Sequence, residues 1–316
     1  MKTAFIFSGQ GAQYIGMGKE LYENIDECRE FYNKANDALG FDITNMILDG
    51  NADELNITEN TQPAILTTSI AALKALEKNN IKADIVAGLS LGEYSALVAA
   101  GAIDFSDAVS LVKKRGKFMQ EAVPVGIGAM VAVIGLPREK VQEAVDKARE
   151  KGIVEVANYN TSKQIVIGGE VEAVEYAKEI VLELGARRAI SLKVSGPFHT
   201  SMLHEAALKL EEELKKVEFK DLSIPLVCNV HGEFIKDKSE IISLLVKQIE
   251  SSVRWEESIR LMLENGVDTF IEVGPGRVLS GFVRDISKAL EKKVNIFNVE
   301  DLKSLEKTLE GVKNIC

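Results

Sequence analysis

The chain has 316 residues, of which 46% are hydrophobic and 27% charged, and this composition is ordinary for a globular protein with a buried core. Its 38 basic and 48 acidic residues give a net charge of -10, which argues against broad electrostatic binding of nucleic acid or of an anionic membrane. We therefore expect any anionic partner to bind a local basic patch.

No targeting signal or membrane span is expected from the sequence. The apolar run at residues 4–7 is far too short for the core of a signal peptide, and no stretch approaches the roughly 18 apolar residues that a membrane span needs. Cys28, Cys228 and Cys316 are odd in number and form no CxxC pattern, which argues against a disulfide framework or a zinc site. We interpret them as reduced thiols and predict a cytoplasmic protein.

The first part of the chain predicts a strand followed by helices. Residues 3–7 (TAFIF) indicate a short buried strand that runs into the glycine-rich turn GQGAQ, and helical spacing follows over about 16–39. Residues 62–79 predict a helix rich in Ala and Leu, with Pro63 near its first turn, where a missing N–H costs little.

Ser90 lies between a predicted strand and a predicted helix. A brief apolar run at 84–88 indicates the strand, and the helix is expected to continue to about Ala100. Between them GLSLG at 88–92 matches G-x-S-x-G, in which the serine occupies a strained turn at a helix amino terminus, where negative charge is favoured. The pattern predicts a nucleophile, and the alternative is a turn in which Ser90 only caps the helix.

Residues 128–193 predict a different order of strands and helices. They predict a strand, a helix, two strands, a helix and a strand, and this βαββαβ order is typical of a ferredoxin-like unit. The expected elements are 129–135, 138–152, 153–159, 164–169, 171–185 and 187–194, with a turn at 160–162. We interpret this segment as a small subdomain inserted into a larger one.

The remaining chain returns to α/β character. We expect an apolar stretch at 224–230, helices near 239–265, a strand at 269–273 that ends at a Gly-Pro-Gly turn, and a last strand near 294–298.

A serine nucleophile needs a base, and the sequence offers three histidines. His199 lies at a Gly-Pro turn that leads from the small subdomain into a helix, where catalytic side chains are commonly presented. His204 is interpreted as a solvated or capping residue and His231 as a turn residue. In an α/β-hydrolase the histidine follows the triad acid close to the carboxyl end. Because a long segment still follows His199, a plain esterase fits poorly.

Two further features point towards acyl transfer. The GQGAQ turn can direct backbone N–H groups at the crevice and supply half of an oxyanion hole, while the N–H of Leu91 supplies the other half. The basic cluster KKRGK at 113–117 follows an apolar helical face. From spacing alone, such a cluster is more often a solvated face than a site.

Taken together, these segments resemble the malonyl-CoA:acyl carrier protein transacylases of fatty acid synthesis and the related acyltransferase domains of polyketide synthases. Five ordered blocks carry the resemblance: FSGQGAQYIGMG at 7–18, TQPAI at 61–65, GLSLGEYSALVAAG at 88–101, KRGKFMQEA at 114–122 and GPFH at 196–199. The resemblance covers essentially the whole chain. It implies an α/β fold with a hydrolase-like catalytic core, containing a parallel sheet, at 1–126 and 197–316 and an inserted ferredoxin-like subdomain at 127–196.

The resemblance also implies a role for each site residue. Ser90 corresponds to the acylated serine and His199 to its general base. Gln10 and Leu91 would contribute the oxyanion-hole amides. Arg115 corresponds to the arginine that pairs with the free carboxylate of the malonyl group.

Four further positions are read through the same resemblance. Gln248, in VKQIESSVRW, matches the position whose main-chain carbonyl holds the histidine ring in place of a triad carboxylate. Asn160 lies in a segment that resembles the coenzyme-binding edge of the family. Phe198 resembles malonyl-selecting members. Leu89 is a departure, because many members have histidine immediately before the serine.

The implied activity is transfer of malonyl from malonyl-CoA to the phosphopantetheine thiol of acyl carrier protein through an ester on Ser90. No metal, bound cofactor, nucleic acid or membrane is implied. We expect the acidic carrier protein to dock on local basic residues near the cleft mouth, namely Lys113, Lys114, Arg187, Arg188 and Lys193. The alternatives are a serine thioesterase or hydrolase, a non-catalytic acyl-CoA-binding protein, and an acyltransferase that serves a polyketide-type synthase.

Overall fold

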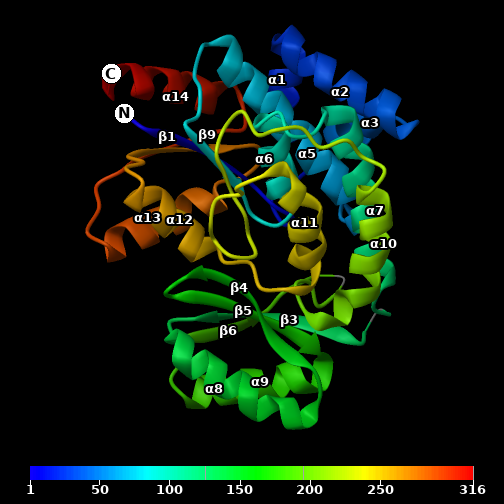
Figure 1. Cartoon of the computed structure of the whole chain (residues 1–316), viewed down its shortest axis with the longest axis vertical. Helices are drawn as coiled ribbons and strands as arrows, with labels where there is room; N and C mark the ends of the chain where they lie inside the picture. Colours follow the sequence, from blue (N-terminus) through cyan, green and yellow to red (C-terminus); the bar gives the residue numbers. More distant parts are fainter. Residues whose placement is uncertain (125, 195, 316) are drawn as a thin grey trace.

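Two β-sheets organise the molecule, as the computed structural model shows for residues 1–124, 126–194 and 196–315 (Figure 1). The larger sheet has the strand order β7-β2-β1-β8-β9, and all of its pairings are parallel. Its strands are β1 (Thr3–Phe7), β2 (Ile85–Gly88), β7 (Leu226–Val227), β8 (Thr269–Val273) and β9 (Asn295–Val299). The predicted strands at 3–7 and 269–273 are confirmed to the residue.

Helices cover both faces of the larger sheet, because its strands carry apolar side chains on both faces. Phe5 and Phe7 point into one core, and Ala4 and Ile6 point into the other. The first core is closed by α1 (Lys19–Asn24), α2 (Asp26–Leu39), α3 (Ile43–Asp49), α4 (Ala52–Leu55), α5 (Thr58–Lys78), α6 (Gly92–Ala99), α7 (Phe105–Glu121), α10 (His204–Leu214), α11 (Ile241–Glu250) and α14 (Leu302–Ile315). The second is closed by α12 (Trp255–Glu264) and α13 (Val278–Ala289).

The smaller sheet is antiparallel, with the order β4-β5-β3-β6. Its strands are β3 (Gly128–Ile134), β4 (Val154–Thr161), β5 (Gln164–Glu170) and β6 (Arg188–Ser191), and its helices are α8 (Arg138–Ala148) and α9 (Val171–Glu183). The chain order βαββαβ confirms the predicted fold class, a parallel α/β core plus a ferredoxin-like unit. All of these elements lie within the expected insertion at 127–196, whose boundaries stay a prediction.

The smaller sheet uses one face for its own core and the other to join the larger core. Val131 and Val133 pack beneath α8 and α9, whereas Met130 and Ala132 belong to the core of the larger sheet. This follows from the strand geometry, in which successive side chains point to opposite faces. One face of the smaller sheet therefore shares a hydrophobic core with one face of the larger sheet.

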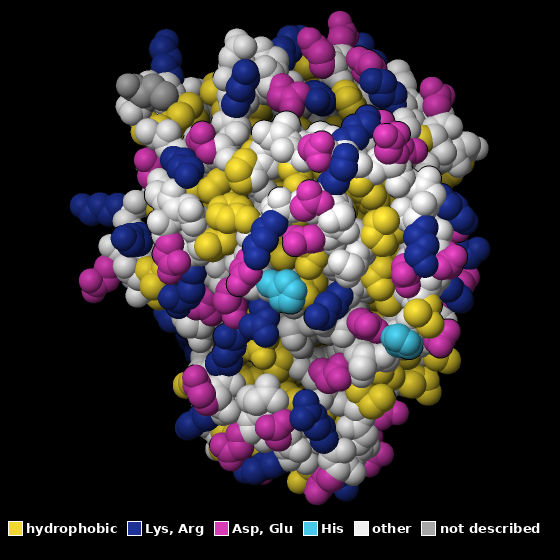
Figure 2. All heavy atoms as spheres, viewed as in Figure 1, with side chains coloured by type: hydrophobic (Ala, Val, Ile, Leu, Met, Phe, Trp, Pro, Cys, Tyr) yellow, Lys and Arg dark blue, Asp and Glu magenta, His cyan; other side chains and the backbone are white. Residues whose placement is uncertain are grey.

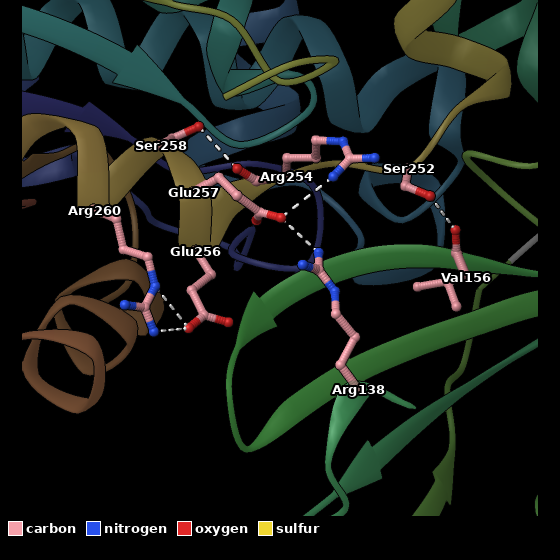
Figure 3. A network of polar contacts seen from close by, with 8 residues as sticks. All are labelled: Arg138, Val156, Ser252, Arg254, Glu256, Glu257, Ser258 and Arg260. Atoms are coloured by element: carbon pink, nitrogen blue, oxygen red, sulfur yellow. Dashed lines mark hydrogen bonds and ion pairs between the residues drawn. The ribbon is translucent and has the colours of Figure 1, made fainter. Parts of the chain in front are cut away.

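Side-chain contacts reinforce this junction, as Figure 3 shows. Arg138 at the start of α8 donates to the carboxylate of Glu257 on α12 at 2.6 Å, and Arg254 contacts the same carboxylate at 3.3 Å. The hydroxyl of Ser252 donates to the carbonyl of Val156 on β4 at 2.5 Å. We call these five residues the subdomain clasp; they hold β4 and α8 against α12.

Two predicted boundaries differ clearly from the structure. Helix α5 begins at Thr58 rather than at residue 62, so Pro63 lies in its second turn and interrupts one backbone hydrogen bond. The polar segment before Pro63 had no apolar periodicity to indicate a helix, yet Thr61 is buried and its hydroxyl donates to the carbonyl of Leu55. Strand β4 continues through Asn160, which was expected in a turn.

The apolar stretch at 224–230 contains only a two-residue strand, β7. Two short 3-10 helices flank helices of the larger core, η2 (Ser201–Leu203) before α10 and η3 (Lys238–Glu240) before α11, and η1 (Arg149–Lys151) follows α8.

Candidate active site

Ser90 stands on a tight turn between β2 and α6 with a left-handed φ of 53°. A Cβ atom on Gly88 would lie 1.9 Å from the carbonyl carbon of Gly92. A Cβ on Gly92 would lie 2.1 Å from the carbonyl oxygen of Phe7. Only glycine allows this approach of strand and helix, and the approach presents the Ser90 hydroxyl at the carboxyl end of the parallel sheet, where α/β proteins place their sites.

His199 and Gln248 lie next to Ser90, although they come from distant parts of the chain. The Nε2 atom of His199 lies 2.8 Å from Oγ of Ser90, and Nδ1 lies 2.8 Å from the carbonyl oxygen of Gln248 on α11. Since a carbonyl can only accept, Nδ1 carries the proton and Nε2 offers its lone pair to the serine hydroxyl. The structure thus brings together the three residues that the sequence analysis grouped.

Burial keeps the histidine neutral. His199 is only 5% exposed, and burial, followed by the positive charge of Arg115, lowers its pKa from 6.5 to about 4. The imidazole is therefore neutral at pH 7. A neutral imidazole in contact with a hydroxyl can act as a general base.

Arg115 points inward from α7 and is fully buried. Its Nη1 donates to the side-chain oxygen of Gln62 at 2.8 Å, and Nη2 donates to the side-chain oxygen of Gln248 at 2.9 Å and to Oγ of Ser90 at 3.2 Å. Burial lowers the pKa of Arg115, but a guanidinium stays charged at neutral pH. Within the described ranges it forms no ion pair, so a cation beside the nucleophile is held by neutral groups alone.

The two lysines that precede Arg115 in the sequence form ion pairs, unlike Arg115. Lys113 is paired with Glu59 at 2.8 Å, and Lys114 is paired with Glu213 at 2.6 Å, both near the surface. The basic cluster is thus a solvated face at these two positions and part of the site at Arg115.

The two predicted oxyanion-hole amides belong to turns that pack together. A Cβ on Gly9 would lie 2.4 Å from the carbonyl oxygen of Leu89, so the turn after β1 touches the turn that carries Ser90. In the part of the chain that the structure describes, the backbone amides of Gln10 and Leu91 donate no hydrogen bond. Both are therefore free to bind an oxygen of a ligand.

Three site residues were missed by the sequence analysis. Gln62 holds Arg115, and its Nε2 lies 3.5 Å from the side-chain oxygen of Gln10. Asn229 accepts from the Ser90 amide at 2.6 Å and donates to the carbonyl of Gly88 at 2.7 Å. Glu93 is fully buried and accepts from both Asn229 and Gln248.

The sequence contains some features that could have pointed to these three residues. Gln62 lies inside the TQPAI block, and Glu93 is a lone acid on an otherwise apolar helix. Asn229 lies two residues after β7, beyond the carboxyl end of a parallel strand, where functional groups are often found.

The other predicted positions lie as follows. Asn160 is 6% exposed, and its side-chain oxygen has no hydrogen-bond partner among the described residues. Phe198 is buried in the larger core, and Leu89 packs partly buried against the second core. His204 is exposed and pairs with Glu250 at 2.7 Å, which raises its pKa.

His231 lies in an exposed turn. Of the expected docking residues, Arg187, Arg188 and Lys193 are exposed. Cys28 and Cys228 are buried free thiols, and Cys316 lies outside the described residues.

Neither a metal centre nor a membrane span is found in the ranges that the structure describes. No group of three or more His, Cys, Asp or Glu side chains there could hold a metal ion. No helix there is both long and apolar enough to cross a bilayer.

Comparisons with known proteins agree with this geometry. The family model described as "Acyl transferase domain" matches residues 4–307. A malonyl CoA-acyl carrier protein transacylase of Bacillus subtilis is 46% identical over 99% of this chain and 98% of its own length. The crystal structure of a transacylase of the same name from Clostridium perfringens is 52% identical, with a TM-score of 0.96 over 100% of this chain and 98% of that one.

A malonyl-transacylase solved in complex with its type II PKS acyl-carrier protein is 39% identical, with a TM-score of 0.95 over 98% of this chain and 100% of that one. The chain therefore belongs to the acyl transferase domain family, among the malonyl CoA-acyl carrier protein transacylases.

Proposed function

We propose that this protein transfers a malonyl group from malonyl-CoA to the phosphopantetheine thiol of an acyl carrier protein in fatty acid synthesis, through an ester on Ser90. Its family membership supports the reaction. The observation that carries the acyl specificity is the buried Arg115 guanidinium, whose Nη2 lies 3.2 Å from the Ser90 hydroxyl. An anion-binding group beside a nucleophile suits an acyl group that ends in a carboxylate.

In the first half-reaction, Nε2 of His199 takes the proton of Ser90 as Oγ attacks the thioester carbonyl carbon. The amides of Gln10 and Leu91 stabilise the tetrahedral oxyanion, each such donor being worth about 3 kcal/mol. The carbon–sulfur bond then breaks, and the histidine proton passes to the leaving coenzyme A sulfur. The carbonyl of Gln248 keeps the ring oriented and accepts from Nδ1 throughout.

In the second half-reaction, the phosphopantetheine thiol gives its proton to His199 and attacks the ester carbonyl. The same two amides stabilise the second oxyanion, and Oγ leaves with the proton from Nε2. The enzyme returns to its starting state, and ping-pong kinetics follow.

Selectivity follows from the partners of Arg115. A carboxylate would form a bidentate, charge-assisted pair with the guanidinium, whereas an acetyl group would leave it with neutral partners only. The buried, unpartnered side-chain oxygen of Asn160 is proposed to face the coenzyme-binding edge.

The proposed reaction requires no metal and no bound cofactor, since coenzyme A enters as part of the substrate. We propose a cytoplasmic location, with which two unpaired buried thiols agree. A relative solved with its carrier protein supports an acyl carrier protein as the second partner, and the same residues could serve a polyketide-type synthase.

Mass spectrometry of the intact protein after brief exposure to malonyl-CoA tests the proposal. We expect the mass of one malonyl group on Ser90, its loss on addition of phosphopantetheinylated carrier protein, and no adduct on Ser90→Ala. An adduct released to water as fast as to the carrier protein would indicate a thioesterase. No adduct on the parent protein would indicate a non-catalytic acyl-CoA-binding protein.

A further inference from the structure

Glu93 is a buried carboxylate that the proposed mechanism does not use. It lies on α6, three residues after the nucleophile, and its side chain has no exposure to solvent. Its Oε2 accepts from the amide nitrogen of Asn229 at 3.2 Å and from Nε2 of Gln248 at 2.7 Å. Burying a carboxylate costs free energy, so we asked what Glu93 contributes to the site in return.

Each partner of Glu93 holds a different part of the site. Asn229 bridges the serine turn, since it accepts from the Ser90 amide and donates to the carbonyl of Gly88. Because the backbone amide of Asn229 itself donates to Glu93, the carboxylate fixes the loop from which this bridge is made.

Gln248 is held by donors and acceptors that allow one orientation of its amide. Its Nε2 faces two acceptors, Glu93 and the carbonyl of Ser90 at 3.0 Å, and its Oε1 faces the Nη2 donor of Arg115 at 2.9 Å. The main-chain carbonyl of the same residue holds Nδ1 of His199. One glutamine therefore links Glu93 to the base and to the anion-binding cation.

We propose that Glu93 is a positioning residue for the transfer reaction, whose buried carboxylate holds Asn229 and Gln248 and thereby aligns Ser90, His199 and Arg115. The inference rests on the proposed function. The main-chain carbonyl of Gln248 contacts His199 at the place that a carboxylate occupies in a catalytic triad. Glu93 contacts the side chain of the same Gln248 and so brings a negative charge close to the histidine without contacting it. That charge favours the imidazolium that forms during proton transfer, and it opposes the binding of a second carboxylate at Arg115.

The charged and titratable groups around Glu93 come from several elements. They are Arg115 on α7, Tyr94 on α6 and Cys228 after β7, while α11 contributes the Gln248 amide. Burial raises the pKa of Glu93 to about 7, against the hydrogen bonds and the charge of Arg115, which lower it. Loss of the carboxylate charge on acidification through this pH should therefore slow transfer.

The test uses the full chain, malonyl-CoA and a phosphopantetheinylated carrier protein over pH 5 to 9. Glu93→Gln keeps an acceptor of the same shape and removes the charge. We expect kcat to fall about tenfold to a hundredfold, the KM for malonyl-CoA to stay level or fall, and the step in kcat near pH 7 to disappear. A purely structural role would not separate kcat from KM or change the pH profile.

Glu272→Gln is the matched control. Glu272 on β8 is also buried, its pKa is also raised to about 7 by burial, and it accepts from the amides of Leu279 and Ser280 at the start of α13. None of its hydrogen bonds involves a site residue, so the control should keep the parent kcat and pH profile. Glu93→Asp, which keeps the charge but shortens the side chain, should lower kcat and retain the step near pH 7.

The outcomes separate this inference from the proposed function. A Glu93→Gln protein with the parent kcat and pH profile would overturn the positioning role while malonyl transfer by the parent stands. If Glu93→Gln does not fold, Glu93→Asp decides, and an unchanged kcat there overturns the inference. A parent protein that transfers no malonyl group would instead contradict the proposed function itself.

Discussion

At the scale of single residues, Arg115 is a buried cation that could recognise the carboxylate of a substrate. Its three hydrogen-bond acceptors are two amide oxygens and the nucleophile, all uncharged. Burial of a cation that forms no ion pair is unfavourable; the nearby charge of Glu93 offsets part of this cost, and a bound anion would offset more. If the proposed function is correct, this arrangement should favour a malonyl group over an acetyl group.

We predict that Arg115→Ala loses malonyl transfer by at least about a hundredfold, because one charge-assisted pair is worth roughly 3 kcal/mol. Transfer of acetyl or longer acyl groups should persist or rise. Parallel assays with malonyl-CoA and acetyl-CoA measure this, and Lys117→Ala on the exposed side of the same helix is the control. Equal loss for both acyl groups would refute the selectivity role.

His199 makes stability depend on pH. Burial lowers its pKa to about 4, so between pH 4 and 6.5 the unfolded chain binds more protons than the folded one, and the free energy of unfolding rises with pH. Relative to His199→Gln, the parent protein should lose up to about 3 kcal/mol as the pH falls from 7 to 4. Urea unfolding of both proteins at several pH values measures the difference, and a constant difference would contradict the lowered pKa.

At the level of elements, the turn between β2 and α6 depends on two glycines in contact with backbone atoms. The sequence was sufficient to predict it, because strand, motif and helix are contiguous. The predicted βαββαβ order was also correct, since each of its elements has its own periodicity. Both predictions depended only on patterns between residues that are close in the sequence.

Glu93 and Asn229 were not predictable in the same way. Their contact joins residues 136 positions apart, and the bond from Ser90 to Asn229 spans 139 positions. A buried acid and a strand-end asparagine are each common, and only the folded chain shows that they meet. The start of α5 was misplaced for a related reason, since buried threonines rather than an apolar stripe hold its first turn.

We predict that Gly92→Ala destabilises the protein by at least about 3 kcal/mol or abolishes acylation of Ser90, because its Cβ would overlap the carbonyl of Phe7. Gly281→Ala in α13 is the control. No heavy atom lies within 4 Å of a Cβ at Gly281, so alanine there should stabilise the helix by up to about 1 kcal/mol. Thermal unfolding and the malonyl adduct assay check both variants, and a neutral Gly92→Ala would contradict the tight turn.

At the scale of the whole molecule, the proposed site joins two parts of the chain. Ser90 follows a strand of the larger sheet, and His199 follows the smaller sheet in the chain. The subdomain clasp and the shared core fix these two parts relative to each other (Figures 1 and 3). Acidic and basic side chains are interspersed over the face seen in Figure 2, so an acidic carrier protein must find a local basic surface.

We predict that reversing the charge of Arg187, Arg188 and Lys193 together raises the KM for carrier protein by about tenfold and leaves acylation by malonyl-CoA unchanged. Reversal at Lys113 and Lys114 should have a smaller effect, because both already pair with glutamates. Steady-state kinetics at varied concentrations of carrier protein measure the KM of the triple variant and of the Lys113 and Lys114 variant. An unchanged KM in the triple variant would exclude this surface.

The left-handed backbone at both Ser90 and His199 has a consequence for the molecule as a whole. A residue with a Cβ at φ 53° or 61° costs roughly 1 kcal/mol over glycine, so each of the two proposed catalytic residues lowers the free energy of unfolding. A dead Ser90→Gly protein should therefore melt at a higher temperature than its working parent. If Ser90 and His199 carry out the proposed chemistry, selection of this protein for heat resistance alone would act against both residues.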